Sequence, residues 1–141
     1  MSKAIRIFTI GFAQKSAREF LTLLMDAGVK TVVDVRLNNV SQLAGFSKKD
    51  DLEYFLQSID KIGYLHKPEW APTKEILDAY KKKEIDWVEY EKKFRALLVD
   101  RKAENLSKPK EMDGCCLLCS EPTAEKCHRR LLSEYFALSK R

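Results

Sequence analysis

Reactive side chains cluster near the C-terminus, where one segment contains all four cysteines of the chain and one of its two histidines. Cys119 and Glu121 follow an apolar run, and Cys127, His128 and Arg129 come together after a Glu-Pro turn. Thiols and carboxylates can act as nucleophiles, an imidazole can move a proton, and a guanidinium can bind an anion. The segment therefore predicts nucleophilic or acid–base chemistry on an anionic group.

The same segment predicts a strand, a tight turn and the start of a helix. Cys115–Cys119 is short, apolar and preceded by Gly114, as expected of a buried parallel strand. A helix should follow from about Ala124, with Thr123 as its N-cap and Cys127 in its first turns. The free N–H groups and the dipole of a helix N-terminus favour anions and lower the pKa of a thiol.

Each candidate also has a purely structural interpretation. Cys119 can be a small packed hydrophobe, and Cys127 is either a nucleophile or a side chain that packs inward. Glu121 can act as a general base or as a nucleophile towards a sugar carbon, or it can cap the following helix. His128 is the candidate proton shuttle, and Arg129 is a candidate anion-binding residue.

Apolar periodicity over the rest of the chain predicts alternating strands and helices. Residues 1–36 fit a βαβ unit whose two strands form a parallel pair. We expect one domain over residues 1–141, a three-layer α/β sandwich with a small, mostly parallel sheet of about four strands. Before the cysteine segment, the expected elements are strands over Ile5–Ile10, Thr31–Val35 and Gly63–His66, and helices over Ser16–Ala27, Asp51–Ile59, Ile76–Lys83 and Trp87–Arg101.

Ligands of such sheets bind beyond the carboxyl ends of the strands. If the first strand neighbours both the second and the last, then Gly11, Arg36, Cys119 and Glu121 surround one crevice. Arg36 can bind an anionic ligand there, or it can form a structural ion pair with Asp34 or Glu121.

Composition sets outer limits on the function. The chain has 26 Lys and Arg against 21 Asp and Glu, a net charge of +5, which tolerates anionic ligands without requiring them. No apolar leader or membrane span is visible, so we expect a cytoplasmic protein whose thiols stay reduced, without disulfides. The expected partner is a small anionic or nucleotide-like ligand. Nucleic acid and a homodimer stay open, and no membrane is expected.

The sequence motifs do not indicate a nucleotide cofactor or a metal site. Gly11 is followed by Phe-Ala-Gln-Lys-Ser, which lacks both Walker and dinucleotide spacing. Cys116 and Cys119 are three residues apart and point to opposite faces of a strand, so they cannot share one ion. A set of Cys119, Cys127 and His128 stays open, but its adjacent ligands argue against zinc, and we assign no metal residues.

Three short motifs together resemble the domain of unknown function 488 family. They are Thr9-Ile10-Gly11, Asp34-Val35-Arg36, and Cys119-Ser-Glu121 followed by Cys127-His128-Arg129. The likeness covers nearly the whole chain and implies that Ser41 contacts the substrate. Such families usually carry His-Ser after Thr-Ile-Gly, where this chain has Phe12 and Ala13, and a proline often precedes the serine. These departures imply altered substrate contacts.

The sequence leaves two hypotheses for the function. The first is a small enzyme, a hydrolase or transferase, that acts on a phosphate-bearing or nucleotide-like substrate. In it, Arg36 and Arg129 hold the anion, Cys127 or Glu121 attacks, and His128 moves a proton. The alternative is a non-catalytic module that binds a nucleotide or nucleic acid in the same basic pocket.

Overall fold

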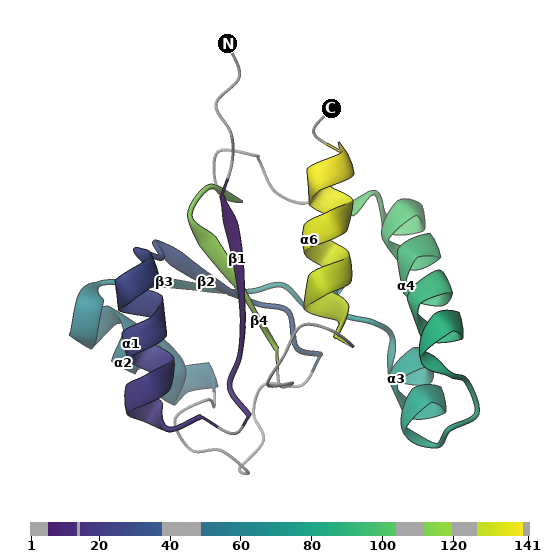
Figure 1. The fold of residues 1–141 in the computed structure, drawn as a ribbon, viewed down its shortest axis with the longest axis horizontal. Coiled ribbons are helices and arrows are strands. Elements are labelled where there is room, and N and C mark those ends of the chain that lie inside the picture. Colours follow the sequence, from purple (N-terminus) through teal and green to yellow (C-terminus); the bar gives the residue numbers. More distant parts are fainter. Residues whose placement is uncertain (1–5, 14, 38–48, 104–111, 120–126, 140–141) are drawn as a thin grey trace.

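The computed structural model describes residues 6–13, 15–37, 49–103, 112–119 and 127–139. In these residues, helices cover both faces of a four-stranded parallel sheet (Figure 1), which confirms the expected three-layer α/β sandwich. The described elements are β1 (Ile7–Gly11), α1 (Ala17–Ala27), β2 (Thr31–Asp34), α2 (Lys49–Asp60), β3 (Gly63–His66), the 3-10 helix η2 (Pro68–Trp70), α3 (Lys74–Lys81), α4 (Trp87–Arg101), β4 (Cys115–Cys119) and α6 (His128–Ser139).

Side-chain caps begin three of these helices. Ser16, Thr73 and Asp86 each accept a hydrogen bond from the backbone N–H three residues later, at 3.1, 3.2 and 2.9 Å. Gly28 ends α1 with a φ of 73°, a left-handed conformation that suits a residue without a Cβ. None of the described helices is long and apolar enough to span a membrane.

The strand order is β1-β4-β2-β3, and every pair is parallel. Because β4 separates β1 from β2, the expectation that the first two strands pair with each other is wrong. Burial explains the order: all five residues of β4 are buried, whereas β1 and β3 keep partly exposed residues. A strand without a polar face gains most from the middle of a sheet. This position brings Cys119 next to Gly11 in register.

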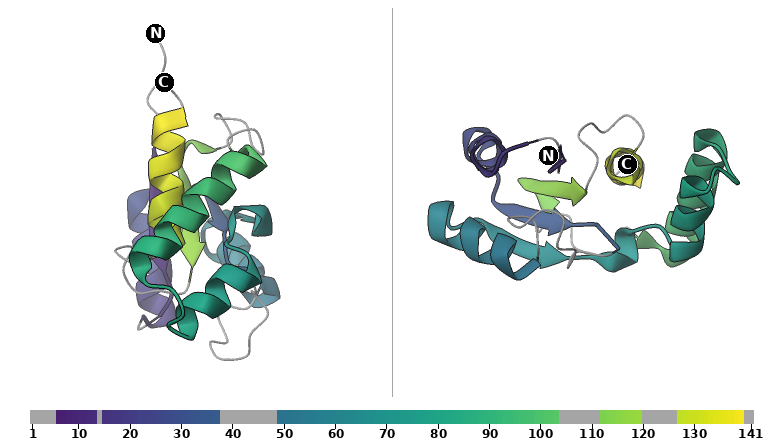
Figure 2. Two further views of the ribbon diagram at one scale, coloured as in Figure 1. Left: turned by 90° about the vertical axis from the view of Figure 1, so that its right-hand side faces the viewer. Right: turned by 90° about the horizontal axis from the view of Figure 1, so that it is seen from below.

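Successive residues of β4 pack into two apolar clusters on opposite faces of the sheet. Cys116 and Leu118 belong to the cluster formed with α1 and α2, whereas Cys115, Leu117 and Cys119 belong to the cluster formed with α4 and α6. Figure 2, seen from below, shows these two groups of helices on the two sides of the sheet. The last strand therefore connects both halves of the core.

Crossed ion pairs also join α4 to α6. Nη2 of Arg95 donates to Oε1 of Glu134 at 2.6 Å, and Nη2 of Arg130 donates to Oε1 of Glu91 at 3.0 Å. All four side chains are partly exposed, so each pair adds little stability alone. They form where α4 packs against α6 and crosses it at an angle (Figure 2).

Leu117→Ala should lower the free energy of unfolding by about 2–5 kcal/mol, because Leu117 is fully buried and its truncation leaves a cavity. The matched control is Leu65→Ala on β3, whose side chain is 43% exposed and should lose only about 1 kcal/mol. Urea denaturation followed by circular dichroism measures both losses. Equal losses would contradict the central position of β4.

Candidate functional site

The candidate site forms where β4 ends and α6 begins. Cys119 is the last residue of β4, and its carbonyl accepts a hydrogen bond from the N–H of Phe12, just beyond β1, at 3.3 Å. The helix starts at His128, so Cys127 directly precedes its first residue and does not lie inside its first turns as expected. The carbonyl of Cys127 accepts the N–H of Arg130 at 3.2 Å, as suits a flanking residue of a helix. Residues 120–126, including Thr123 and Glu121, lie outside the described residues.

Cys119 and Cys127 are joined by a disulfide, and both residues are buried. The expectation that the chain has no disulfide is therefore wrong. That expectation rested on a reducing compartment and on the adjacent positions of Cys115 and Cys116. The end of β4 and the start of α6 instead bring Cys119 and Cys127 together. Their Cα atoms lie 7.8 Å apart, beyond the usual span of roughly 4.4–6.8 Å, so this backbone also accommodates two separate thiols.

A buried guanidinium lies against both sulfur atoms. Nη1 of Arg129 is 2.9 Å from Sγ of Cys119 and 3.6 Å from Sγ of Cys127. Arg129 is only 2% exposed, so water screens its charge weakly. In the reduced protein, such a cation favours a thiolate over a thiol.

His128 supplies a neutral imidazole to the same site. Its Nε2 lies 2.7 Å from the carbonyl oxygen of Val35; because a carbonyl only accepts, Nε2 must carry the proton. Nδ1 is then unprotonated in the neutral ring and lies 4.0 Å from Sγ of Cys127. Burial lowers the pKa of His128 to about 4, with a further contribution from Arg129, and these effects outweigh the hydrogen bond to Val35. The ring is therefore oriented to accept a proton from Cys127.

Arg36 forms a buried ion pair with Asp34, one of the two roles that the sequence left open. Nε of Arg36 donates to Oδ1 at 2.8 Å and Nη2 to Oδ2 at 2.7 Å, and the hydroxyl of Tyr64 also donates to Oδ2. Burial alone would raise the pKa of Asp34, but the hydrogen bonds and charge of Arg36, with the bond from Tyr64, hold it below its usual range. The carboxylate therefore stays ionised.

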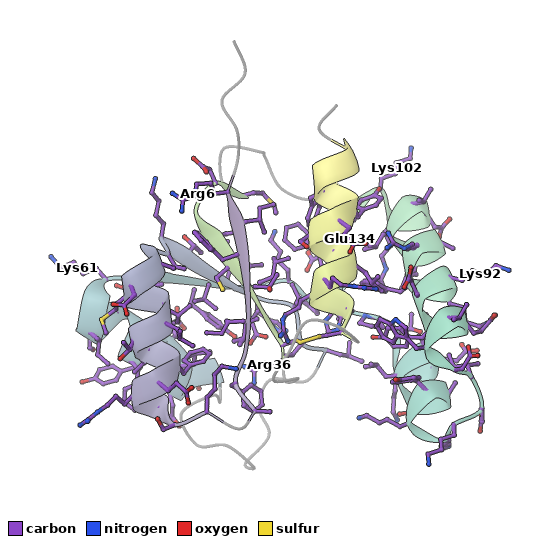
Figure 3. The ribbon with its side chains drawn as sticks, in the orientation of Figure 1. Arg6, Arg36, Lys61, Lys92, Lys102 and Glu134 are labelled. Atoms are coloured by element: carbon purple, nitrogen blue, oxygen red, sulfur yellow. A yellow bond between two sulfur atoms is a disulfide. The ribbon has the colours of Figure 1, made fainter. Side chains whose placement is uncertain are left out.

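The ion pair and the cysteines lie on different faces of the sheet. Val33 and Val35 pack on the α4/α6 side, so Asp34 and Arg36 alternate to the other side, where the guanidinium of Arg36 lies 5.2 Å from the centre of the Phe12 ring. Figure 3 shows Arg36 near the strand ends and the sulfur–sulfur bond beside the start of α6. The backbone of Val35 connects the two groups through its bond to His128.

A cavity of about 400 Å³ opens beside the site along β1. Its lining includes the charged residues Lys15 and Arg129, the backbone at Gly11, and apolar residues such as Phe8 and Leu23. Of the residues expected to surround one crevice, Gly11 lines this cavity and lies beside Cys119 in register, whereas neither Cys119 nor Arg36 lines it. Glu121 and Ser41 lie outside the described residues, so their roles stay predictions.

Among the described residues, three neighbouring side chains could hold a metal ion. The ligand atoms of Cys119, Cys127 and His128 lie within 4.8 Å of one another, and two sulfurs with one nitrogen suit zinc. Cys116 packs on the opposite face of β4, as its spacing predicts, and cannot join them. The guanidinium of Arg129 beside both sulfurs opposes a second cation at the same position.

Two polar residues of this region were not identified from the sequence. Tyr64 bonds the Asp34 carboxylate, and Lys15 lines the cavity. The signal for Lys15 was its position between β1 and the cap of α1, at the carboxyl edge of the sheet. His66, the last residue of β3, places Nε2 at 2.9 Å from the carbonyl oxygen of Arg36.

These features define a small parallel α/β protein with a buried cysteine pair at the carboxyl edge of its sheet. The chain belongs to the family described as domain of unknown function DUF488, whose model matches residues 16–136. No match was found among curated proteins or among solved structures.

The stability of the protein should decrease as His128 becomes protonated. Folding lowers the pKa of His128 from 6.5 to about 4, so its stabilising contribution is present above pH 6.5 and is lost as the pH falls towards 4. By pH 5 the loss should be about 2 kcal/mol. Urea denaturation at a series of pH values measures it, and His128→Gln should show a weaker pH dependence. Parallel profiles for the two proteins would contradict a neutral, buried His128.

Asp34→Asn should destabilise the protein by about 3–5 kcal/mol at pH 7, because it removes the carboxylate from a buried guanidinium. Because folding lowers the pKa of Asp34, its contribution should be lost only as the pH falls below the usual carboxyl range. The matched control is Glu134→Gln in the exposed pair with Arg95, with an expected loss below about 1 kcal/mol. Chemical denaturation compares the two, and similar losses would mean that the Asp34 pair is not a structural requirement.

Proposed function

We propose that the protein is a small enzyme in which Cys127 attacks a phosphate-bearing or nucleotide-like substrate. The observation that supports this most is the position of Arg129, which contacts both sulfur atoms and also lines the cavity. One cation can therefore stabilise a thiolate and hold the anionic group of a ligand.

In this proposal, the reduced Cys127 supplies the nucleophile. Its proton moves to Nδ1 of His128, whose ring is held by the bond from Nε2 to Val35. A pKa of about 4 makes His128 a weak base, so Arg129 provides most of the stabilisation of the thiolate. The same low pKa makes the imidazolium a strong acid. It returns the proton to the leaving group as the sulfur forms its bond to the electrophilic atom.

The residues that line the cavity support the proposed class of ligand. Lys15 and Arg129 offer positive charge at its polar part, and the apolar side chains of Phe8 and Leu23 offer a surface for a ring. Gly11 brings the backbone of β1 close to the ligand because it has no side chain. We expect Glu121 and Ser41 to add contacts, whereas the ion pair with Asp34 gives Arg36 a supporting role.

The alternative is a binding module that uses the same cavity without attack by Cys127. Lys15 and Arg129 would then hold an anionic nucleotide, and Cys127 would be a packed side chain. The two functions differ in the reactivity of one sulfur atom, which can be measured without a known substrate.

Alkylation by iodoacetamide should modify Cys127 of the reduced protein at a pH well below the usual pKa of a free thiol, about 8.5, because Arg129 favours the thiolate. Cleavage after Lys126 separates Cys127 from the other three cysteines, so mass spectrometry follows each peptide. Inorganic phosphate or adenosine monophosphate, compared with chloride at equal ionic strength, should slow the reaction.

Cys116 is the internal control for this experiment. It lines the same cavity, but burial raises its pKa to about 12, so it should stay unmodified in the folded protein. If Cys127 reacts only after unfolding, the enzyme proposal is wrong. Protection of Lys15 from acetylation by adenosine monophosphate would then support the binding module.

A further inference from the structure

We infer that Cys119 and Cys127 form a reversible redox pair, which a small hydroperoxide oxidises and a dithiol reduces. The inference goes beyond the proposed attack on a substrate and does not depend on it. It rests on the geometry of the two sulfur atoms, on the charge beside them and on the cavity that reaches that charge.

The pair joins two separate elements of the fold. Cys119 is fixed by the central strand β4, which is hydrogen-bonded on both sides, whereas Cys127 directly precedes α6. The sulfur atoms meet in a disulfide, although the Cα atoms lie farther apart than in most disulfides. Because a disulfide at this Cα separation requires backbone movement, the two thiols fit the described backbone when reduced, and the bond draws the end of β4 and the start of α6 towards each other.

The charge around the pair favours reaction over inert packing. Arg129 lies within 3.6 Å of both sulfurs and stabilises a negative charge on either one. Nδ1 of His128 faces Cys127 and can take its proton. Cys116, on the other face of β4, has a pKa raised to about 12 chiefly by burial, and no such thiolate is expected there.

A small oxidant can approach through the cavity. Arg129 lines the cavity of about 400 Å³ and also donates to Sγ of Cys119 at 2.9 Å, so one residue contacts both the cavity and the sulfur pair. Hydrogen peroxide is about the size of two water molecules and needs much less space than this. Larger thiol reagents should react more slowly.

Hydrogen peroxide oxidises the cysteine pair in two steps. The Cys127 thiolate attacks one oxygen of hydrogen peroxide, so that an S–O bond forms and the O–O bond breaks. The sulfur becomes a sulfenic acid, and the released hydroxide takes a proton to form water. Cys119 then attacks the Cys127 sulfur, so that the S–S bond forms and the S–O bond breaks. The second hydroxide leaves as water with the proton of Cys119. Two electrons from an external dithiol reverse the change by thiol–disulfide exchange.

We assign the attack to Cys127 and the closing step to Cys119. Nδ1 of His128 lies 4.0 Å from the sulfur of Cys127, in position to take its proton, whereas Cys119 is fixed at the end of a central strand. Oxidation would also remove the nucleophile of the proposed enzyme, so the redox state of the pair would switch that activity off.

The test uses the full chain, first reduced with dithiothreitol and then treated with hydrogen peroxide. Mass spectrometry should show the loss of two hydrogen atoms and a peptide that links Cys119 to Cys127, and dithiothreitol should reverse both changes. In Cys119→Ser, dimedone should trap a sulfenic acid on Cys127. In Cys127→Ser, no trapped product should form. Cys116→Ala is the matched control, because Cys116 lines the same cavity, and it should oxidise like the natural protein.

Arg129→Met should slow oxidation about tenfold or more, since it removes a charged hydrogen-bond donor, and Arg129→Lys should restore part of the rate. Absence of the linked peptide in the folded natural protein would overturn the inference, as would a trapped sulfenic acid on Cys119 in Cys127→Ser. Release of bound zinc on thiol modification would also overturn it in favour of a metal site. An alkylatable Cys127 that forms no disulfide would leave the proposed enzyme intact and remove only the redox pair.

Discussion

The hydrogen bonds that hold β4 between β1 and β2 determine the rest of the structure. They bury an entirely apolar strand on both faces and divide the core into two clusters that share this strand. They also fix Cys119 beside Gly11 at the carboxyl edge of the sheet. Because α6 returns over the same edge, Cys127 and Arg129 reach the sulfur of Cys119 from the side of the helix. The site is thus a consequence of strand order rather than of one motif.

The two buried arginines near the strand ends have different chemical surroundings. Arg36 is held by both oxygens of Asp34, so its charge is matched by an ionised carboxylate that Tyr64 also supports. Arg129 donates to sulfur, which is a weak acceptor as a thiol and a strong one as a thiolate. The charge of Arg36 therefore stabilises the fold wherever Asp34 is ionised, which includes neutral pH. Arg129 stays charged in either case, but the strength of its hydrogen bonds to sulfur depends on the state of the cysteines, which links the electrostatics of the site to its chemistry.

Much of the fold was predictable from the sequence, because local signals agreed with the final structure. The strands over Gly63–His66 and Cys115–Cys119 and the helix over Trp87–Arg101 all have the expected bounds. Strand order was not predictable, since the βαβ pattern does not state which later strand will enter between the first two. The cysteine pair was missed for the same reason. Two residues from different elements meet only when the sheet is assembled, and the sequence shows their types but not their separation.

The position of β1 has a consequence for how a ligand could be recognised. In the described sheet, β1 pairs with β4 on one side only, and its residues Thr9, Ile10 and Gly11 line the cavity. The outer edge of a parallel strand carries main-chain N–H and C=O groups at regular intervals. The main-chain groups of β1 can therefore form hydrogen bonds with a molecule in the cavity. Contacts of that kind do not depend on which side chains the strand carries, so substitutions along β1 can change the shape of the cavity while its pattern of donors and acceptors persists.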